Sequence, residues 1–203
     1  LWESQMNRLI IVGASGHGKV IADIAIQVGY QEIVFLDDNE TICECAGFPV
    51  IGKPSLLISE LKGDKIIAIG NPQIRQRLQA KTEVVTLIHP SAIIGRNVEI
   101  GAGTVIMPGA VINSETKIGR GCIINTCASV DHDCALDDFV HIAVGAHVAG
   151  TCTVGERTWI GAGATVSNNI KICKDCMVGA GAVVVNNILI NGTYIGCPAK
   201  RIK

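Results

Sequence analysis

An aliphatic residue recurs at every sixth position of the second half of the chain, and this period restricts the fold more than any other feature. The series runs from Ile94 to Ile190, and all seventeen positions hold Ile, Val or Leu. Small residues recur two positions earlier, from Ala92 to Ala182. A period of six fits neither a helix nor an alternating strand. It predicts a parallel β-helix of five to six unbroken coils, each a triangle of about eighteen residues, stacked at the strand spacing.

Two further features of the repeat concern its corners and its cysteines. The residue after the aliphatic position is often Gly, Asn or Asp, which we interpret as tolerance of a tight corner. Four of the nine cysteines occupy the small-residue position and are predicted to act as small hydrophobes: Cys122, Cys134, Cys152 and Cys176. The pairs Cys43/Cys45 and Cys173/Cys176 are weak zinc signals without a second pair. No metal site is expected.

The first half of the chain predicts a small Rossmann-like α/β domain with a parallel sheet. Strands are expected at 8–13, 33–37, 65–71 and 84–87, and helices from after Gly18 to about Gly29 and at 73–80. The expected division is an α/β domain over 6–85, a β-helix over 86–190 and a tail over 191–203, with a hinge at His89-Pro90. Residues 1–5 precede Met6 and fit no pattern, so we expect them to be foreign to the natural chain.

Composition excludes several classes of function. The net charge is -1, and no basic run offers a surface for nucleic acid. The apolar runs are too short for a membrane span, and no signal-peptide pattern is visible, so a cytoplasmic location is expected.

A glycine loop, Gly13 to Gly18, joins the first strand to the first helix. Glycines let the backbone approach a ligand closely, and a helix N-terminus favours anions. Asp37 ends the next strand, where a dinucleotide fold would bind ribose. The alternatives are a turn without a ligand and a nicotinamide enzyme.

His132 differs from the other four histidines because it lies between two acids, Asp131 and Asp133. Its place in the repeat puts it at a corner, pointing away from the core. A carboxylate beside an imidazole fixes its tautomer and favours the imidazolium, as a general base requires. Gly150, eighteen residues on, should leave space over the ring. The spacing leaves open which acid tunes the histidine.

Small residues also stack at one corner of three successive coils, over 143–145, 161–163 and 179–181. This predicts a groove around Ala162 and Ala180 that suits the slim pantetheine arm of a coenzyme. The alternative is a general preference for Gly and Ala at corners.

The combination of IIVGASGHGKV, FLDD, AIGN and an unbroken hexapeptide helix that ends in GCPAKRI resembles the NeuD/PglD-type sugar O- and N-acyltransferases. The resemblance covers the chain from Met6, and within the family the chain is most similar to the N-acetyltransferases of UDP-4-amino-sugars in bacillosamine synthesis. It implies a left-handed β-helix and a homotrimer with the active site at the seam between subunits. Asp133 stands where that type has Glu.

The resemblance also implies an activity and its residues. An acetyl-CoA-dependent enzyme would N-acetylate a UDP-4-amino-sugar for a bacterial surface glycan or glycoprotein. His132 would be the general base, tuned by Asp133, with Asn125 as a helper near the oxyanion. His141 would contact acetyl-CoA from the adjacent subunit, together with Ala162 and Ala180. The nucleotide-sugar would be held by six residues of the first domain: Ser15, Gly16, His17, Asp37, Asp38 and Gly70.

Several alternatives remain open at this stage. The acceptor could be a hydroxyl of a sialic acid or polysaccharide, and the chain could be a non-catalytic nucleotide-sugar-binding subunit. Three histidines could also indicate a carbonic-anhydrase-like β-helix with zinc between subunits. Cys127 or Cys134 could carry an acyl group. His141 could simply stack on Trp159, which lies eighteen residues further on.

Overall fold

The computed structural model describes residues 7–58 and 61–202, so residues 1–5 lie outside the described part. The chain divides into two compact units, Leu1–Ile88 and His89–Lys203. Among the described residues, no helix is long and apolar enough to cross a membrane.

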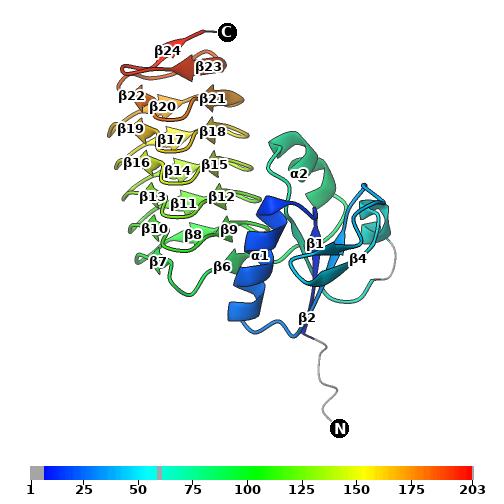
Figure 1. Ribbon diagram of the computed structural model, residues 1–203. Coiled ribbons are helices and arrows are strands. Elements are labelled where there is room, and N and C mark those ends of the chain that lie inside the picture. The colour runs from blue at the N-terminus through cyan, green and yellow to red at the C-terminus, as the bar shows by residue number, and fades with distance from the viewer. Residues whose placement is uncertain (1–6, 59–60, 203) are drawn as a thin grey trace. The chain divides into compact units, whose positions relative to one another are not determined.

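The first unit is a five-stranded sheet in the order β3-β4-β2-β1-β5, with two α-helices and one 3₁₀ helix (Figure 1). Strands β1, β2, β4 and β5 are parallel, and β3 pairs antiparallel with β4. The two central strands are continuous apolar runs buried on both faces, as parallel strands are. The elements are β1 (Arg8–Val12), α1 (Gly16–Gln27), β2 (Glu32–Leu36), β3 (Glu44–Cys45), β4 (Phe48–Gly52), η1 (Pro54–Ile58), β5 (Asp64–Ile67) and α2 (Pro72–Gln79).

The sequence prediction for this unit was wrong in two places. It missed the hairpin of β3 and β4, in which β3 has only two residues and no residue of β4 is fully buried. The strand expected at 84–87 does not form beside β5, although the Val85 N–H bonds the Lys65 carbonyl. Leu87–Ile88 instead forms β6, which pairs with β9.

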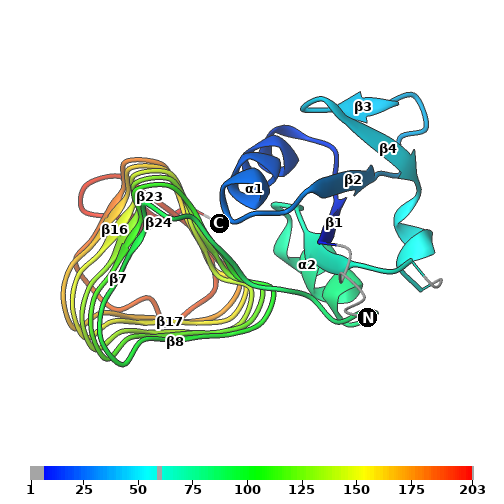
Figure 2. The ribbon, with the colours of Figure 1, turned by 90° about the horizontal axis from the view of Figure 1, so that it is seen from below.

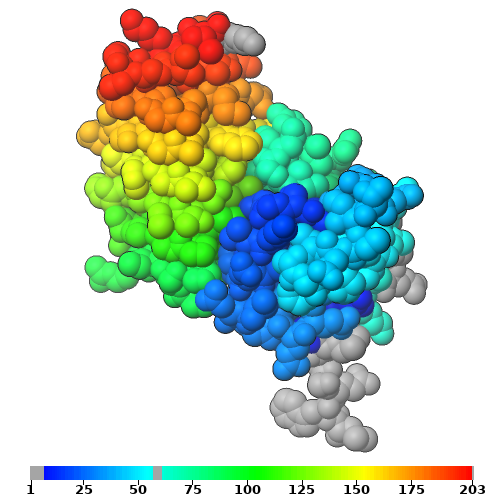
Figure 3. All heavy atoms as spheres, in the orientation of Figure 1, coloured from blue at the N-terminus to red at the C-terminus, as the bar shows by residue number. Residues whose placement is uncertain are grey.

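The second unit is a parallel β-helix, as the six-residue period predicts. Figure 2 shows its triangular coils end on, and Figure 3 shows the close stacking of successive coils. Up to the last coil, successive strands on one face pair in parallel at a spacing of eighteen residues, for example Val111 with Ser129. One face is the six-stranded sheet of β7 (Ile93–Ile94), β10 (Val111–Ile112), β13 (Ser129–Val130), β16 (His147–Val148), β19 (Thr165–Val166) and β22 (Val183–Val184).

The other two faces complete the triangle. The second sheet consists of β8 (Glu99–Ile100), β11 (Lys117–Ile118), β14 (Ala135–Leu136), β17 (Thr153–Val154) and β20 (Lys171–Ile172). The third consists of β6, β9 (Val105–Ile106), β12 (Ile123–Ile124), β15 (His141–Ile142), β18 (Trp159–Ile160), β21 (Cys176–Val178), β23 (Gly192–Ile195) and β24 (Lys200–Arg201), of which only β24 is antiparallel.

The core of the β-helix is built from the two predicted columns. The aliphatic positions and the small positions two residues earlier form one buried cluster. Cys122, Cys134, Cys152 and Cys176 are at most 3% exposed and pack in this cluster, so their prediction as small hydrophobes is confirmed.

The corners correct the interpretation of the glycines that follow the aliphatic residues. The left-handed backbone falls on the third residue of each corner, such as Asn97, Glu115 or Asp133, and not on the first. The first residue is Gly for another reason. A Cβ on Gly95 or Gly101 would stand 2.6 Å from a backbone nitrogen of the next coil. These glycines allow close coil stacking rather than an unusual turn.

The last coil breaks the predicted register. Ile190, the final position of the series, is 61% exposed, whereas Ile188 is buried and bridges Ile172, sixteen residues before it. Cys176 likewise pairs with Gly192, again sixteen residues on. The coil is therefore two residues short after Val184, and the expectation of an unbroken repeat through Ile190 was wrong.

Candidate active site

His132 lies on the corner that follows β13, and its side chain is 58% exposed. Its Nδ1 is 2.7 Å from Oδ2 of Asp133, the next residue in the chain. At this corner, the backbone of Asp133 is in the left-handed region. This hydrogen bond raises the pKa of His132, and the charge of Asp131 adds to the effect. Because the carboxylate accepts a hydrogen bond from Nδ1–H, Nε2 of the neutral imidazole remains as the acceptor.

Asp131 supports the corner rather than the ring. Its Oδ1 accepts the His132 backbone N–H at 2.9 Å and the Asn113 side-chain amide at 2.6 Å. These bonds, the Asn113 amide first, lower the pKa of Asp131. The Asp131 carbonyl also accepts the Thr116 hydroxyl at 2.7 Å. The geometry therefore distinguishes the two acids that the sequence left open: Asp133 bonds the imidazole, and Asp131 fixes the turn that carries it.

Gly150 lies one coil further on, beside the imidazole. A Cβ at this position would stand 2.7 Å from both Cε1 and Nε2 of His132. Gly150 does not have the positive φ that favours glycine, so its backbone would accept alanine. The space that the sequence predicts beside Gly150 is therefore filled by the imidazole of His132 itself.

The predicted nucleotide-sugar residues partly converge in the first unit. A cavity of about 240 Å³ lies at the carboxyl ends of β1, β2 and β5. Four of the six predicted residues line it: Ser15, Asp37, Asp38 and Gly70. Gly16 and His17 do not line it, although Gly16 is exposed at the start of α1 with open space around it. Parallel sheets bind ligands at this edge.

The two aspartates of this cavity have different surroundings. Both carboxylate oxygens of Asp37 accept backbone N–H groups, from Ala14 and Asn39, each at 2.8 Å. Asp37 therefore fastens the glycine loop to the end of β2. The carboxylate of Asp38 is exposed and makes no hydrogen bond to a described residue, which leaves it available to a ligand.

Arg75 is a further residue of this site that no sequence pattern predicts. This arginine of α2 is 1% exposed, and its Nη1 donates to the carbonyls of Ile69 and Gly70 at 2.7 and 2.9 Å. It therefore fixes the chain segment that lines the cavity. Burial, with a smaller contribution from the Arg75 charge, lowers the pKa of His17 to about 4. His17 is thus a neutral imidazole near neutral pH.

His141 and Asn125 meet on another part of the β-helix from His132. Asn125 Nδ2 donates to His141 Nε2 at 3.1 Å, while Asn125 Oδ1 accepts the Thr126 N–H. The His141 ring packs against Trp159 with centroids 4.4 Å apart, as the stacking alternative expects. Within one chain, Asn125 therefore contacts His141, and it lies on a different corner from His132.

The column of small residues is present and exposed. Ala162 and Ala180 lie on successive coils, above the half-exposed Val144. The N–H of Gly163 bonds the Val144 carbonyl, and that of Gly181 bonds the Ala162 carbonyl. The N–H groups of Ala162 and Ala180 make no hydrogen bond to described residues, so they remain available to a ligand.

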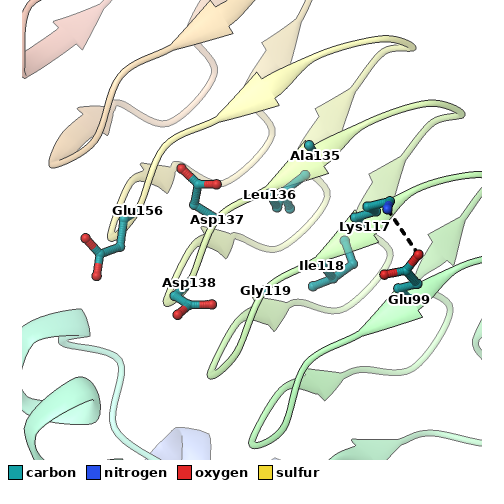
Figure 4. A pocket seen from close by; sticks show the side chains of 9 residues that line it. All are labelled: Glu99, Lys117, Ile118, Gly119, Ala135, Leu136, Asp137, Asp138 and Glu156. Carbon is teal, nitrogen blue, oxygen red and sulfur yellow. Dashed lines mark ion pairs between the residues drawn. The ribbon is translucent and has the colours of Figure 1, made fainter.

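A separate depression of about 530 Å³ lies along β8, β11 and β14 (Figure 4). Its lining includes the ion pair of Glu99 and Lys117 at 3.2 Å and the acids Asp137, Asp138 and Glu156. None of the sequence-predicted site residues lines it. Among the described residues, no group of three or more His, Cys, Asp or Glu side chains could hold a metal ion.

Comparison with known proteins agrees with both halves of the chain. The model of the PglD N-terminal domain matches residues 8–82, and that of the bacterial transferase hexapeptide repeats matches 97–132 and 151–186. The acetyltransferase domain of PglB from Neisseria gonorrhoeae is 41% identical, with a TM-score of 0.93 over 97% of this chain and 100% of that one. The chain belongs to the PglD/PglB family of hexapeptide-repeat acetyltransferases.

Solved structures of this family include complexes with ligands. The same PglB domain has a structure in complex with acetyl coenzyme A. PerB from Caulobacter crescentus, in complex with CoA and GDP-perosamine, is 36% identical, with a TM-score of 0.88 over 95% of each chain. The UDP-N-acetylbacillosamine N-acetyltransferase of Bacillus subtilis is 38% identical over 109 residues, which span 49% of this chain and half of that protein. These PglD/PglB relatives confirm the resemblance that the sequence indicates.

Proposed function

We propose that the chain transfers an acetyl group from acetyl-CoA to the amine of a nucleotide-linked amino-sugar, specifically a UDP-4-amino-sugar, in the bacterial cytoplasm for glycan or glycoprotein synthesis. The observation that carries this proposal is the bond from His132 Nδ1 to Asp133 on an exposed corner. It provides an oriented base with a free Nε2. Relatives at 36–41% identity are named as acetyltransferases, and their complexes contain CoA or acetyl-CoA.

In the proposed mechanism, the amine attacks the thioester carbonyl and His132 Nε2 takes up its proton. Asp133 stabilises the imidazolium that forms, and Asp131 keeps the corner in place. Both substrates held at one site would supply much of the rate through proximity. A backbone N–H must stabilise the oxyanion, and Ala162 and Ala180 offer such groups. Asn125 acts through His141 in this scheme.

The two substrates would use different units. Ser15, Asp38 and Gly70 line the cavity at the sheet edge, where the start of α1 favours the diphosphate of the nucleotide-sugar. Acetyl-CoA would lie along Ala162 and Ala180, with His141 supplied by a neighbouring subunit. We therefore propose a homotrimer with the active site at the seam, and sedimentation of the pure chain measures this directly.

Two alternative functions make different demands on His132. O-acetylation of a sugar hydroxyl requires a stronger base, because a hydroxyl is a poorer nucleophile than a free amine. A non-catalytic binding subunit would not require a histidine bonded to a carboxylate on an exposed corner.

The deciding experiment follows thiol release from acetyl-CoA in the presence of a panel of acceptors. The panel contains UDP-4-amino-sugars, GDP-perosamine, sialic acid and the corresponding non-amino sugars. Rapid release only with UDP-4-amino-sugars supports the full proposal. Preference for GDP-perosamine would correct the nucleotide, and preference for hydroxyl acceptors would establish O-acetylation. No release with any acceptor, while nucleotide-sugars still bind, would favour the binding subunit.

Asp133→Asn should shift the pH dependence of kcat/KM. The bond to Asp133 raises the pKa of His132, so its removal lowers that pKa, and the neutral base persists to lower pH. The acid limb of the profile should therefore move to lower pH, and the maximal rate should fall less than in a variant without the imidazole. Asp138→Asn is the matched control, because Asp138 bonds Arg120 at another corner and should leave the limb in place. If the acid limb of the profile lies at the same pH in Asp133→Asn and in Asp138→Asn, the assignment of Asp133 as the partner of His132 is wrong.

A substitution in the first unit should weaken only the nucleotide-sugar, and one in the β-helix should weaken only acetyl-CoA. Gly16→Val has space for its side chain and should keep the fold, yet it should raise the acceptor KM by about tenfold, the effect of ~1.4 kcal/mol. Ala180→Leu should weaken acetyl-CoA by a similar factor and leave the acceptor unchanged. Calorimetry of each variant with each ligand measures both effects. Loss of acetyl-CoA binding in Gly16→Val, with the nucleotide-sugar still bound, would invert the assignment.

A further inference from the structure

Cys173 and Cys176 form a pair of thiols that the proposed acetyl transfer does not use. Their Sγ atoms lie 3.5 Å apart across the corner between β20 and β21. Cys173 is half-buried and Cys176 is buried, and both are free thiols. The Cys176 thiol also lies 3.6 Å from the Lys174 carbonyl. A disulfide requires the two sulfurs to approach to about 2.05 Å, so they must come closer by about 1.5 Å.

The corner around this pair is held at both ends by the preceding coil. The Thr158 hydroxyl donates to the Cys173 carbonyl at 2.9 Å and accepts the Cys176 N–H at 3.2 Å. Arg157 bonds both carboxylate oxygens of Asp175, at 2.7 and 2.9 Å. The two thiols therefore stay close without help from a ligand or a partner.

A second pair of stacked cysteines provides a contrast within the same fold. The Cys152 N–H lies 3.4 Å from the Cys134 sulfur, but both residues are at most 1% exposed in the core. An oxidant in water cannot reach them without unfolding. Among the described residues, no third His, Cys, Asp or Glu side chain joins Cys173 and Cys176 as a metal site. Proximity combined with access thus distinguishes Cys173 and Cys176 from the other buried cysteines.

We propose that Cys173 and Cys176 are an oxidation site, at which a peroxide converts the dithiol into a disulfide. The Cys173 sulfur attacks one peroxide oxygen, the O–O bond breaks, and a sulfenic acid and one water form. The Cys176 sulfur then attacks the Cys173 sulfur, the S–O bond breaks, and the departing hydroxide takes the thiol proton as a second water. Two thiols are oxidised and one hydrogen peroxide is reduced to two waters.

The order of the two steps follows from exposure. Cys173 is the thiol that solvent reaches, so it reacts with the peroxide. Burial first, and then the neighbouring Cys173 thiol, raises the pKa of Cys176 to about 12, which keeps Cys176 protonated until the sulfenic acid forms beside it. The inference is independent of the proposed acetyl transfer, because neither its chemistry nor its readout involves either substrate.

The experiment treats the folded chain with hydrogen peroxide, blocks free thiols and digests it with trypsin. Lys174 lies between the two cysteines, so a disulfide joins two tryptic peptides that otherwise separate. The background variant Cys43→Ser/Cys127→Ser/Cys197→Ser removes the exposed cysteines. In this background, oxidation should remove two titratable thiols per chain, restored by a reductant, and the linked peptides should contain Cys173 and Cys176.

Two matched variants separate the steps. In Cys176→Ser, peroxide should leave a sulfenic acid on Cys173 that dimedone traps. In Cys173→Ser, Cys176 should remain an unmodified thiol. The unsubstituted chain also gives linked peptides, and their fragmentation must place the bond on Cys176 rather than on Cys197, which shares its tryptic peptide. A poorly folding variant therefore does not prevent the test. The proposal is overturned if folded protein keeps both thiols under peroxide, if Cys173 stops at sulfenic acid beside an intact Cys176, or if Cys134 and Cys152 become linked equally fast.

Discussion

Replacing His132 by alanine is expected to lower turnover by roughly 10²–10⁴-fold, the usual effect of removing a positioned general base. The ring is exposed, and its corner is held by backbone and side-chain bonds that do not involve the imidazole, such as the Asn113 amide to Asp131. The variant should therefore fold normally. Both substrates should bind with little change, since the proposed contacts of the nucleotide-sugar and of CoA lie elsewhere. Steady-state kinetics with calorimetry of each ligand measures both effects.

The matched control for this variant is His147→Ala. His147 is another exposed histidine of the β-helix, with Nδ1 2.8 Å from the Ser129 hydroxyl instead of a carboxylate. It should keep near-normal turnover. If His132→Ala also keeps near-normal turnover at neutral pH, another group accepts the proton and the assignment of the base is wrong.

The β-helix could be predicted from the sequence because the burial of side chains and the geometry of the coils repeat with the same six-residue period. Every sixth side chain points inward, so the sequence alone identifies one aliphatic column and one small column as the core. The same period could have placed Asn125 beside His141, because His141 pairs in register with Ile123, two residues before Asn125. The shortened last coil could not be predicted in this way. Ile188 and Ile190 are equally apolar, and only the bridge from Ile188 to Ile172 selects which of them is buried.

The first unit was harder to predict, because its decisive contacts are not periodic. Arg75 is charged, and a charged residue on a short helix ordinarily indicates an exposed face. It is buried because two carbonyls at the end of the β5 segment accept its guanidinium, and nothing in the local sequence signals those acceptors. The edge hairpin of β3 and β4 was missed for a related reason: its strands bury little apolar surface.

Replacing Gly150 by alanine is expected to displace the His132 imidazole. Gly150→Ala should therefore lower kcat by roughly 10²-fold, the effect of a misplacement of about 1 Å at a reacting group. Its Cβ would stand 2.7 Å from Cε1 and Nε2 of His132, which is closer than such atoms can approach. The backbone at Gly150 has no positive φ, so alanine introduces no strain of its own. The imidazole must therefore move, because its exposed side chain is more mobile than the stacked coil. Steady-state kinetics of the single variant measures the loss.

A double variant shows whether the loss acts through the ring. In a chain that already carries His132→Ala, the clash is absent, so adding Gly150→Ala should change neither the residual turnover nor the melting temperature. The two substitutions are then strongly non-additive, as expected for residues in contact. A full further loss in the double variant would show that Gly150 acts independently of His132, for example by contacting a substrate directly. Near-normal kcat in Gly150→Ala alone would mean that the observed position of the imidazole is not the one that catalysis requires.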